Sequence, residues 1–544
     1  MGSGMKRREF LVTGVAGSVV AVGMPAGAWG RPVPTSVVDT TSGKVRGKRV
    51  GGVSDFLGIP YGGNTALRRF LPAVAPTPWT GVRECVVLGH QAPQMALGPD
   101  GRSGPKPDMS SPFIKRLIAA ATQGMEVGNE SEDCLVINVY TPDPSPARKR
   151  PVMVWLHGGG MAIGSSGDPQ YNGNALARHG DVVVVGLNHR LNALGFLYLG
   201  AFSDDFADSG NLGMLDIVFA LEWVRDNIAN FGGDPDNVTV FGESGGGAKV
   251  SFTLAMPPAK GRFHKAIIQS GATLVGLQKQ KAVAHAERTL ANLGVAQADV
   301  HRLRAMDYRR IIAAAKAAEE GDHSLLRPMV DGRSLPRDPF SPTAPQVSRD
   351  VPIMVGTTKD EDTLFMSADP LFGKMTDEQA RQRAAHFLGA KASEALDLIK
   401  TLRPSYTPTY WLADLMTANG AWKRSIALAE RKLVQHAGSV HMWRLDWVSY
   451  FDHGILKSPH GLDTDLVFDN PQTKSLMNGP GPQPREIAAV MSRAWINFAR
   501  SGDPSQGGLR WPKYDTASRK TMIFDVRSHV VEDPDRPLRK LLVS

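Results

Sequence analysis

The sequence predicts an α/β fold, in which a mostly parallel central β-sheet carries helices on both faces. Short runs rich in β-branched and other apolar residues recur along the chain, and helical patterns separate several of them, an alternation typical of parallel sheets with helical crossovers. With 544 residues, 42% of them hydrophobic, the chain is long enough to bury a large core. The expected strands span residues 135–140, 152–156, 181–187, 238–241, 266–270, 351–356 and 440–445.

Helices are expected both between these strands and in one insertion. The stretch 214–231 has apolar residues at helical spacing, and Gly232 and Gly233 follow it as a stop signal. Between about residues 280 and 440, helical patterns crowd together with few strands, which predicts a helical insertion that caps the sheet. A Gly-, Pro- and Ser-rich stretch at 97–112 predicts a long surface loop.

The charge pattern argues against a nucleic-acid partner. Lys and Arg number 62 against 53 Asp and Glu, a formal net charge of +9, but these residues are scattered and form no long basic run after the first ten residues. The two cysteines, Cys85 and Cys134, allow at most one internal disulfide and cannot form a metal site alone.

The N-terminal residues resemble an export signal. Residues 1–4 precede a second methionine and are interpreted as a cloning scar. A basic segment (KRREFL), an apolar segment (VTGVAGSVVAVGM) and a small-residue cleavage site (AGA) follow, and the Arg-Arg pair resembles a twin-arginine signal. We therefore expect residues 1–28 to be removed and the protein to be periplasmic or extracellular, with residues 29–544 forming a single domain.

Removal of this segment takes away three basic residues and one acidic residue, so the net charge falls from +9 to +7. The alternative, an uncleaved membrane anchor, is disfavoured because an apolar stretch of roughly 15 residues is shorter than the ~20 needed to span a bilayer. No later segment of the sequence is long and apolar enough, so no stable membrane insertion is expected after signal removal.

A serine lies in a glycine-rich turn directly after the expected strand 238–241. In this G-x-S-x-G motif, Gly242 and Gly246 leave room for a sharp strand-to-helix turn that exposes the Ser244 hydroxyl in a strained conformation. The following helix directs its N-terminal N–H groups and dipole to the same point, where they stabilise a developing oxyanion. The pattern predicts a nucleophilic serine.

A second glycine cluster, HGGG, follows the expected strand 152–156. An acyl-transfer enzyme needs backbone N–H groups that approach a carbonyl oxygen without interfering side chains. Gly159 and Gly160 are the expected donors of this oxyanion hole, with Gly245 as the third.

A nucleophilic serine needs a histidine to take its proton and an acid to orient that histidine. In enzymes with this strand–serine–helix turn, the chain order is serine, acid, histidine. Asp360, Glu361 and Asp362 follow the strand at 351–356, and His453 and His460 follow the strand at 440–445. Spacing does not choose within either set.

Several longer segments allow a family comparison. They are FLGIPYG (56–62), SEDCLVINVY (131–140), HGGG (157–160), GNLGMLDIVFALEWVRDNIANFGGDPDNVTVFGESGGG (210–247), FHKAIIQSGA (263–272), VGTTKDE (355–361), SPHGLDTDLVF (458–468) and FARSGDP (498–504). From about residue 35 to the end, the chain resembles type-B carboxylesterases, the cholinesterase-like branch of the α/β-hydrolases. The resemblance implies an α/β-hydrolase fold and a catalytic triad of Ser244, Glu361 and His460, with Asp463 and Phe468 in register after the histidine.

The sequence departs from the family pattern at three places. Asp362 follows the implied catalytic acid, where glycine is usual, and offers a second carboxylate. His189 replaces the usual tyrosine of an N-Y-R segment, and we expect it to be packed in the core. Cys134 matches half of a family disulfide, but Ala92 stands at the expected partner position and Cys85 lies seven residues too early, so two free thiols are expected.

The resemblance implies an exported bacterial serine esterase that forms an acyl-enzyme and needs no cofactor. An amidase or acyltransferase using the same triad, or a non-catalytic binding protein of cholinesterase-like fold, are the alternatives. The partner is a small-molecule ester, with its pockets built from residues 97–130 and the insertion. Within the resemblance, one exported bacterial branch cleaves polycarboxylate esters, including the tricarballylate side chains of fumonisins. The net charge favours such anionic substrates if Lys249, Arg327 or His189 line the site.

Overall fold

The computed structural model describes residues 32–94, 110–123, 129–322 and 324–543. The expected signal segment and most of the expected loop at 97–112 lie outside these residues and stay predictions. Within the described residues, no helix is both long and apolar enough to cross a membrane.

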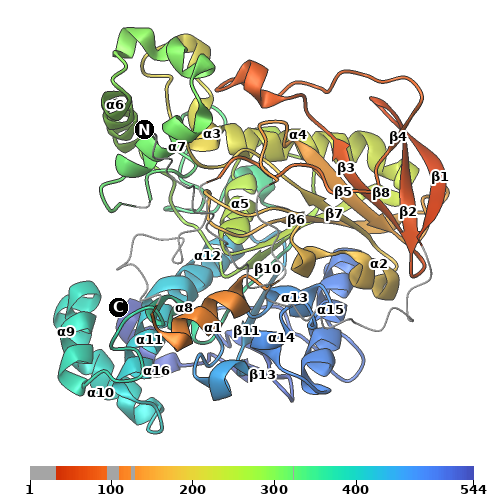
Figure 1. The fold of residues 1–544 in the computed structure, drawn as a ribbon. Coiled ribbons are helices and arrows are strands. Elements are labelled where there is room, and N and C mark those ends of the chain that lie inside the picture. The colour runs from red at the N-terminus through yellow and green to blue at the C-terminus, as the bar shows by residue number, and fades with distance from the viewer. Residues whose placement is uncertain (1–31, 95–109, 124–128, 323, 544) are drawn as a thin grey trace, which may run out of the picture.

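The described strands form one mixed sheet (Figure 1), in the order β1-β2-β3-β5-β7-β6-β8-β9-β10-β11-β12-β13, with β4 paired to β2. The seven neighbours from β7 to β12 run parallel, the pairs at both edges of the main path are antiparallel, and β4 pairs in parallel with β2. The bounds are β1 (Val33–Thr40), β2 (Gly43–Val50), β3 (Val53–Pro60), β4 (Val82–Glu84), β5 (Val136–Thr141), β6 (Arg150–Leu156), β7 (Val183–Leu187), β8 (Gly233–Glu243), β9 (Lys265–Gln269), β10 (Ile353–Thr358), β11 (Val440–Leu445), β12 (Lys520–Phe524) and β13 (His529–Glu532).

The predicted fold class is confirmed, and a strand is present at each of the seven expected positions. The predicted strands did not include β1, β2, β3, β4, β12 or β13. Of these, β1 is exposed at most of its positions and lacks the continuous apolar run that marks a buried strand.

Alternate residues of the central strands pack into two separate cores. On β6, Val152, Val154 and Leu156 contribute to one core, and Met153 and Trp155 contribute to the other. This follows from the two-residue period of a strand, because successive side chains point to opposite faces of the sheet. Helices α4 (Leu212–Asn227), α5 (Gly245–Thr253) and α12 (Lys423–Leu433) contribute to the first core, and α2 (Asn174–Gly180), α13 (Thr464–Val467) and α15 (Gln483–Ser501) to the second.

The expected helix at 214–231 is α4 followed by the short helix η5 (Ile228–Phe231), and Gly232 ends it with φ 83°. The helix carries a buried ion pair with the segment after β7. Asp216 accepts two hydrogen bonds from the Arg190 guanidinium, at 2.6 and 2.8 Å, and a third from the Arg190 backbone N–H at 3.0 Å. Both side chains are almost completely buried.

The expected helical insertion consists of two groups on either side of β10 (Figure 1). In the first group, α6 (Lys279–Leu293) and α7 (Tyr308–Ala317) share a small core with α3 (Asn192–Phe196). The second group contains α8 (Glu361–Met366), α9 (Asp377–Leu388), α10 (Ala392–Leu402), α11 (Pro408–Thr417), the π-helix η10 (Ala418–Trp422) and α12.

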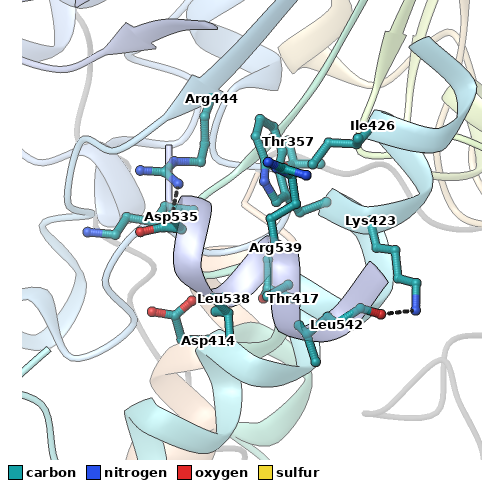
Figure 2. Close-up of a pocket in the computed structure, with 13 residues that line it drawn as sticks. Thr357, Asp414, Thr417, Lys423, Ile426, Arg444, Asp535, Leu538, Arg539 and Leu542 are labelled. Carbon is teal, nitrogen blue, oxygen red and sulfur yellow. Dashed lines mark hydrogen bonds and ion pairs between the residues drawn. The ribbon is translucent and has the colours of Figure 1, made fainter. Parts of the chain in front are cut away.

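The C-terminal helix α16 (Arg536–Val543) closes a small cavity against the second group (Figure 2). Asp535, just before this helix, accepts a 2.6 Å hydrogen bond from Arg444 of β11, and Lys423 of α12 donates to the Leu542 carbonyl at 2.8 Å. The cavity holds about 20 Å³, which is room for roughly one water molecule. It is too small for a substrate, and the contacts of Arg444 with Asp535 and of Lys423 with Leu542 hold the C-terminal helix in place.

Cys85 and Cys134 are both buried and free. Burial raises the pKa of the Cys85 thiol to about 11, and burial also raises the pKa of Cys134. Thiol titration should therefore find two free thiols in the unfolded, unreduced protein and slow reaction in the folded protein, because the thiolate is the reactive form. If no thiol reacts after unfolding, the two cysteines form a disulfide and the prediction of free thiols is wrong.

The buried Arg190–Asp216 pair should contribute far more to stability than an exposed pair on the same helix. Asp216→Ala leaves a buried guanidinium without its partner and should lower the free energy of unfolding by about 3–5 kcal/mol. Asp226→Ala is the matched control, because Asp226 pairs with Arg225 at the surface and such pairs contribute about 1 kcal/mol or less. Urea unfolding, followed by circular dichroism, gives the free energy of unfolding of each variant. Equal decreases in the two variants would refute the larger contribution of the buried pair.

Candidate active site

Ser244 lies at the sharp turn between β8 and α5. Its backbone has φ 57° and ψ −120°, a conformation that costs a residue with a side chain roughly 1–3 kcal/mol. Two hydrogen bonds hold the turn: the Ser244 N–H donates to the Gln269 carbonyl of β9, and its carbonyl accepts from Ala248, both at 2.9 Å. Ser244 is half-buried among fully buried neighbours, so the hydroxyl has an accessible side.

The glycines around this serine are required by close backbone contacts. A Cβ on Gly246 would collide with the Leu156 carbonyl of β6, and one on Gly245 would collide with the backbone of Gly160. Gly159 and Gly160 have φ 85° and 63°, which favour glycine. The predicted donors Gly160 and Gly245 therefore lie side by side, and in the described part of the chain neither the Gly159 nor the Gly160 N–H donates a hydrogen bond.

The three candidate acids have different partners. Asp360 is buried and accepts from the Ser458 N–H at 3.2 Å, and Asp362 accepts from the Thr417 hydroxyl at 3.2 Å. Glu361, at the start of α8, contacts His460 Nδ1 through Oε2. Its other oxygen accepts from the Ser270 hydroxyl at 2.6 Å and from the Thr358 N–H at 2.9 Å. Glu361 is thus the acid that the fold brings to the histidine.

His460 is the histidine at this site. It lines the same pocket as Ser244, whereas His453 is exposed. The His460 Nε2 atom lies 3.2 Å from Glu243 Oε1, and no hydrogen bond between His460 and the Ser244 hydroxyl is formed among the described residues. Glu361 therefore contacts His460, and Ser244 lines the same pocket as this histidine. In this structure the Nε2 atom of His460 is directed toward Glu243.

Two further buried carboxyl groups lie near His460. Burial raises the pKa of Glu243 and of Asp463, and the nearby His460 lowers both in part. Asp463 also accepts a 2.7 Å hydrogen bond from the Gln269 amide. Sequence reasoning did not assign a role to Glu243, although its place beside Ser244 in the G-x-S-x-G motif was a usable signal.

Lys249 and His189 do not line the pocket, so neither meets the condition stated above for a local preference for anions. Lys249, on α5, is fully buried and donates to the His157 carbonyl at 3.0 Å, and burial lowers its pKa to about 7. His189 is buried and stacks on His157 with ring centroids 5.0 Å apart. Burial lowers the pKa of both histidines. The expectation that His189 is packed in the core is met. Lys249 and His189 both contact His157, the first residue of the HGGG segment.

The pocket has a volume of about 500 Å³. It is formed by the serine turn, the start of α8, and the second helical group, so this group supplies its wall as expected. Arg327 is not among its residues and donates instead to the Val275 carbonyl at 3.2 Å. A different arginine, Arg424 of α12, lines it, and no sequence signal marked this residue. The lining residues are Ser244, Ser270, Glu361, Asp362, Phe365, Phe387, Met416, Asn419, Gly420, Ala421, Arg424 and His460.

Within the described residues, no group of three or more His, Cys, Asp or Glu side chains is arranged to hold a metal ion. The chemistry available in the pocket is that of a serine hydroxyl, an imidazole oriented by a carboxylate, and free backbone N–H groups. These are the elements of nucleophilic acyl transfer.

Comparisons with known proteins agree on one family. Residues 34–537 match the carboxylesterase family. The chain is 34% identical over 516 residues to the para-nitrobenzyl esterase of Bacillus subtilis (strain 168), a match that covers 93% of this chain and 98% of that protein. The crystal structure of carboxylesterase EST55 from Geobacillus stearothermophilus superposes with a TM-score of 0.80 at 35% identity, covering 93% of this chain and 99% of that one. Carboxylesterase 1D of Mus musculus is 31% identical over 90% of this chain and 89% of its own length. The chain therefore belongs to the carboxylesterase family, on an α/β-hydrolase fold, and is a carboxylic ester hydrolase.

Proposed function

We propose that this carboxylesterase works through an acyl-enzyme formed on Ser244, with His460 as the general base and Glu361 as the group that orients it. The observation that supports the proposal best is the contact between Glu361 and His460 Nδ1 in the pocket that Ser244 also lines. With Nδ1–H donating to Glu361, Nε2 is the atom whose lone pair accepts the serine proton.

The reaction proceeds in two steps. Ser244 Oγ attacks the ester carbonyl while its proton passes to His460 Nε2, and collapse of the tetrahedral intermediate returns that proton to the leaving alcohol. Water then attacks the acyl-enzyme by the same route and releases the acid. Because Nε2 lies next to Glu243 in the free enzyme, His460 must turn or shift toward the serine when substrate binds.

The N–H groups of Gly159, Gly160 and Gly245 stabilise the tetrahedral oxyanion. Two observations support this: among the described residues the Gly159 and Gly160 N–H groups donate no hydrogen bond, and Gly245 lies against the backbone of Gly160. Donors that are fixed before the reaction need no reorganisation as charge develops, and the loss of one typically costs about 100- to 1,000-fold in rate.

The substrate proposal is an ester that carries additional carboxylate groups, such as a tricarballylate ester of the fumonisin type. Its first support is the expected mature charge of +7, which steers anions toward the protein. Since Lys249 and His189 are buried and Arg327 lies outside the pocket lining, the local support has to come from another cation.

Ser244→Ala should abolish hydrolysis of 4-nitrophenyl butyrate, with a loss of about 10⁶-fold in kcat if the triad acts as a unit. Its thermal midpoint should stay close to the wild-type value, because the Ser244 side chain makes no hydrogen bond in the described structure. Burst kinetics with wild-type enzyme would detect the acyl-enzyme, and added methanol tests whether acyl groups pass to an alcohol as well as to water. Substantial activity in purified Ser244→Ala would exclude this nucleophile.

Glu361→Gln should reduce kcat far more than Asp362→Asn, because Glu361 contacts the histidine whereas Asp362 faces Thr417. The expected loss is about 10³- to 10⁴-fold for Glu361→Gln and less than about tenfold for Asp362→Asn. His460→Ala should match the serine variant, and His453→Ala is the exposed control. Similar losses in the two acid variants would mean that both carboxylates share the role.

A further inference from the structure

Arg424 introduces a cation into a pocket whose other charged groups are acidic. Among the pocket-lining residues in the described part of the chain, Arg424 is the one arginine or lysine. The negative charges of Asp362 and Glu361 lie close enough to stabilise its positive charge. The side chain belongs to the first turn of α12, next to Lys423. Lys423 donates to the Leu542 carbonyl at the small cavity (Figure 2), whereas Arg424 lines the large pocket, so adjacent residues serve different sides of the helix.

The guanidinium of Arg424 has no hydrogen bond or ion pair within 4 Å among the described residues. The buried arginines of the sheet region do have such partners: Arg190 binds Asp216, and Arg444 binds both Asp446 and Asp535. Arg424 is exposed and lines the pocket, so its guanidinium is accessible to a ligand there. A guanidinium has five N–H donors, and those of Arg424 are available to a ligand.

The two acidic neighbours stabilise the charge of Arg424 without using its donors. Partial burial lowers the pKa of Arg424, and Asp362 and Glu361 counteract this effect, so the group stays protonated. The Glu361 oxygens are taken up by His460, Ser270 and Thr358, and Asp362 accepts from Thr417. These carboxylates therefore lie near Arg424 but not in hydrogen-bonding contact with it.

The shape around Arg424 leaves room for a ligand. Gly420, one turn earlier, belongs to the π-helix η10, a type of turn that often occurs at functional sites. A Cβ added to Gly420 would meet only Arg424 Nη1, at 3.9 Å, so the space above this glycine is open. Phe365, Phe387 and Met416 supply apolar wall, which suits the hydrocarbon part of a substrate.

We infer that Arg424 is a specificity-determining residue, which binds a carboxylate carried by the ester substrate while Ser244 attacks the ester carbonyl in the same pocket. The inference rests on the proposed function and adds the group that recognises the anion. A guanidinium binds a carboxylate through two parallel hydrogen bonds, which gives geometric as well as electrostatic selection. The carboxylate belongs either to the acyl part or to the alcohol part of the ester.

The test compares matched esters. For the acyl side, 4-nitrophenyl hydrogen glutarate is compared with 4-nitrophenyl butyrate, since both release the same alcohol. For the alcohol side, 4-carboxyphenyl butyrate is compared with phenyl butyrate. In Arg424→Gln, the ratio of kcat/KM for the anionic over the neutral ester should fall about 10- to 100-fold in one of these pairs, as expected for loss of a charged hydrogen bond. Arg424→Lys should lose less, because it keeps the charge but not the fork of donors.

Arg302→Gln is the matched control, because it removes one positive charge from an exposed position between α6 and α7 and should leave both ratios unchanged. An equal fall in this control would show that net charge, not Arg424, gives the preference. If Arg424→Gln folds and keeps the wild-type ratio of kcat/KM for anionic over neutral esters, the inference is wrong. If that variant does not fold, the inference is wrong when Arg424→Lys keeps the wild-type ratio and the preference for the anionic ester does not depend on salt.

The two levels of the proposal fail differently. Ser244-dependent hydrolysis of neutral esters, without any Arg424-dependent preference, would retain the proposed mechanism and reject the role of Arg424. Ester hydrolysis that survives Ser244→Ala would reject the mechanism itself, whatever the preference for anionic esters.

Discussion

The site depends on the close approach of two backbone segments, the end of β6 and the turn between β8 and α5. These strands are hydrogen-bonded neighbours, so both chains leave the sheet at the same edge and meet. At the meeting point there is no space for a side chain on Gly245 or Gly246. The strained backbone of Ser244 costs roughly 1–3 kcal/mol, and the fully buried strands on both sides hold it in place. The proposed nucleophile and the proposed oxyanion donors thus depend on one packing constraint.

The remaining residues reach the site because consecutive parallel strands end there. The sheet order β8, β9, β10 and β11 brings Ser244, Ser270 and Glu361 to one edge, followed by the loop that carries His460. Parallel strands expose their carboxyl ends along the same side, where open α/β sheets bind their ligands. Asp360, which follows β10, also stabilises this arrangement. It accepts a hydrogen bond from Ser458, in the loop that carries His460.

Sequence analysis located the features that depend on local pattern. Apolar runs marked the central strands, and glycine clusters marked Ser244 and the HGGG segment, because these signals lie within a few residues of one another. The choice of Glu361 over Asp362 came from family resemblance alone. Three adjacent carboxylates differ by where the chain turns after β10, and this turn is set by contacts with residues about a hundred positions away, at Ser458 and His460.

The cations show the same limit. Lys249, His189 and Arg424 all belong to helical or loop segments near the site, yet the first two are buried under the HGGG segment and the third faces the pocket. Net charge says nothing about this difference. For Arg424 the deciding feature is helix phase: a π-helical turn holds about one residue more than an α-helical turn, so η10 rotates α12 by roughly 100° relative to a continuous helix. That rotation places Lys423 toward the C-terminal helix and Arg424 toward the pocket, and the apolar Ile426 contributes to the core. A single irregular turn, which no composition or periodicity of the sequence indicates, thus determines which basic side chain of α12 lines the pocket.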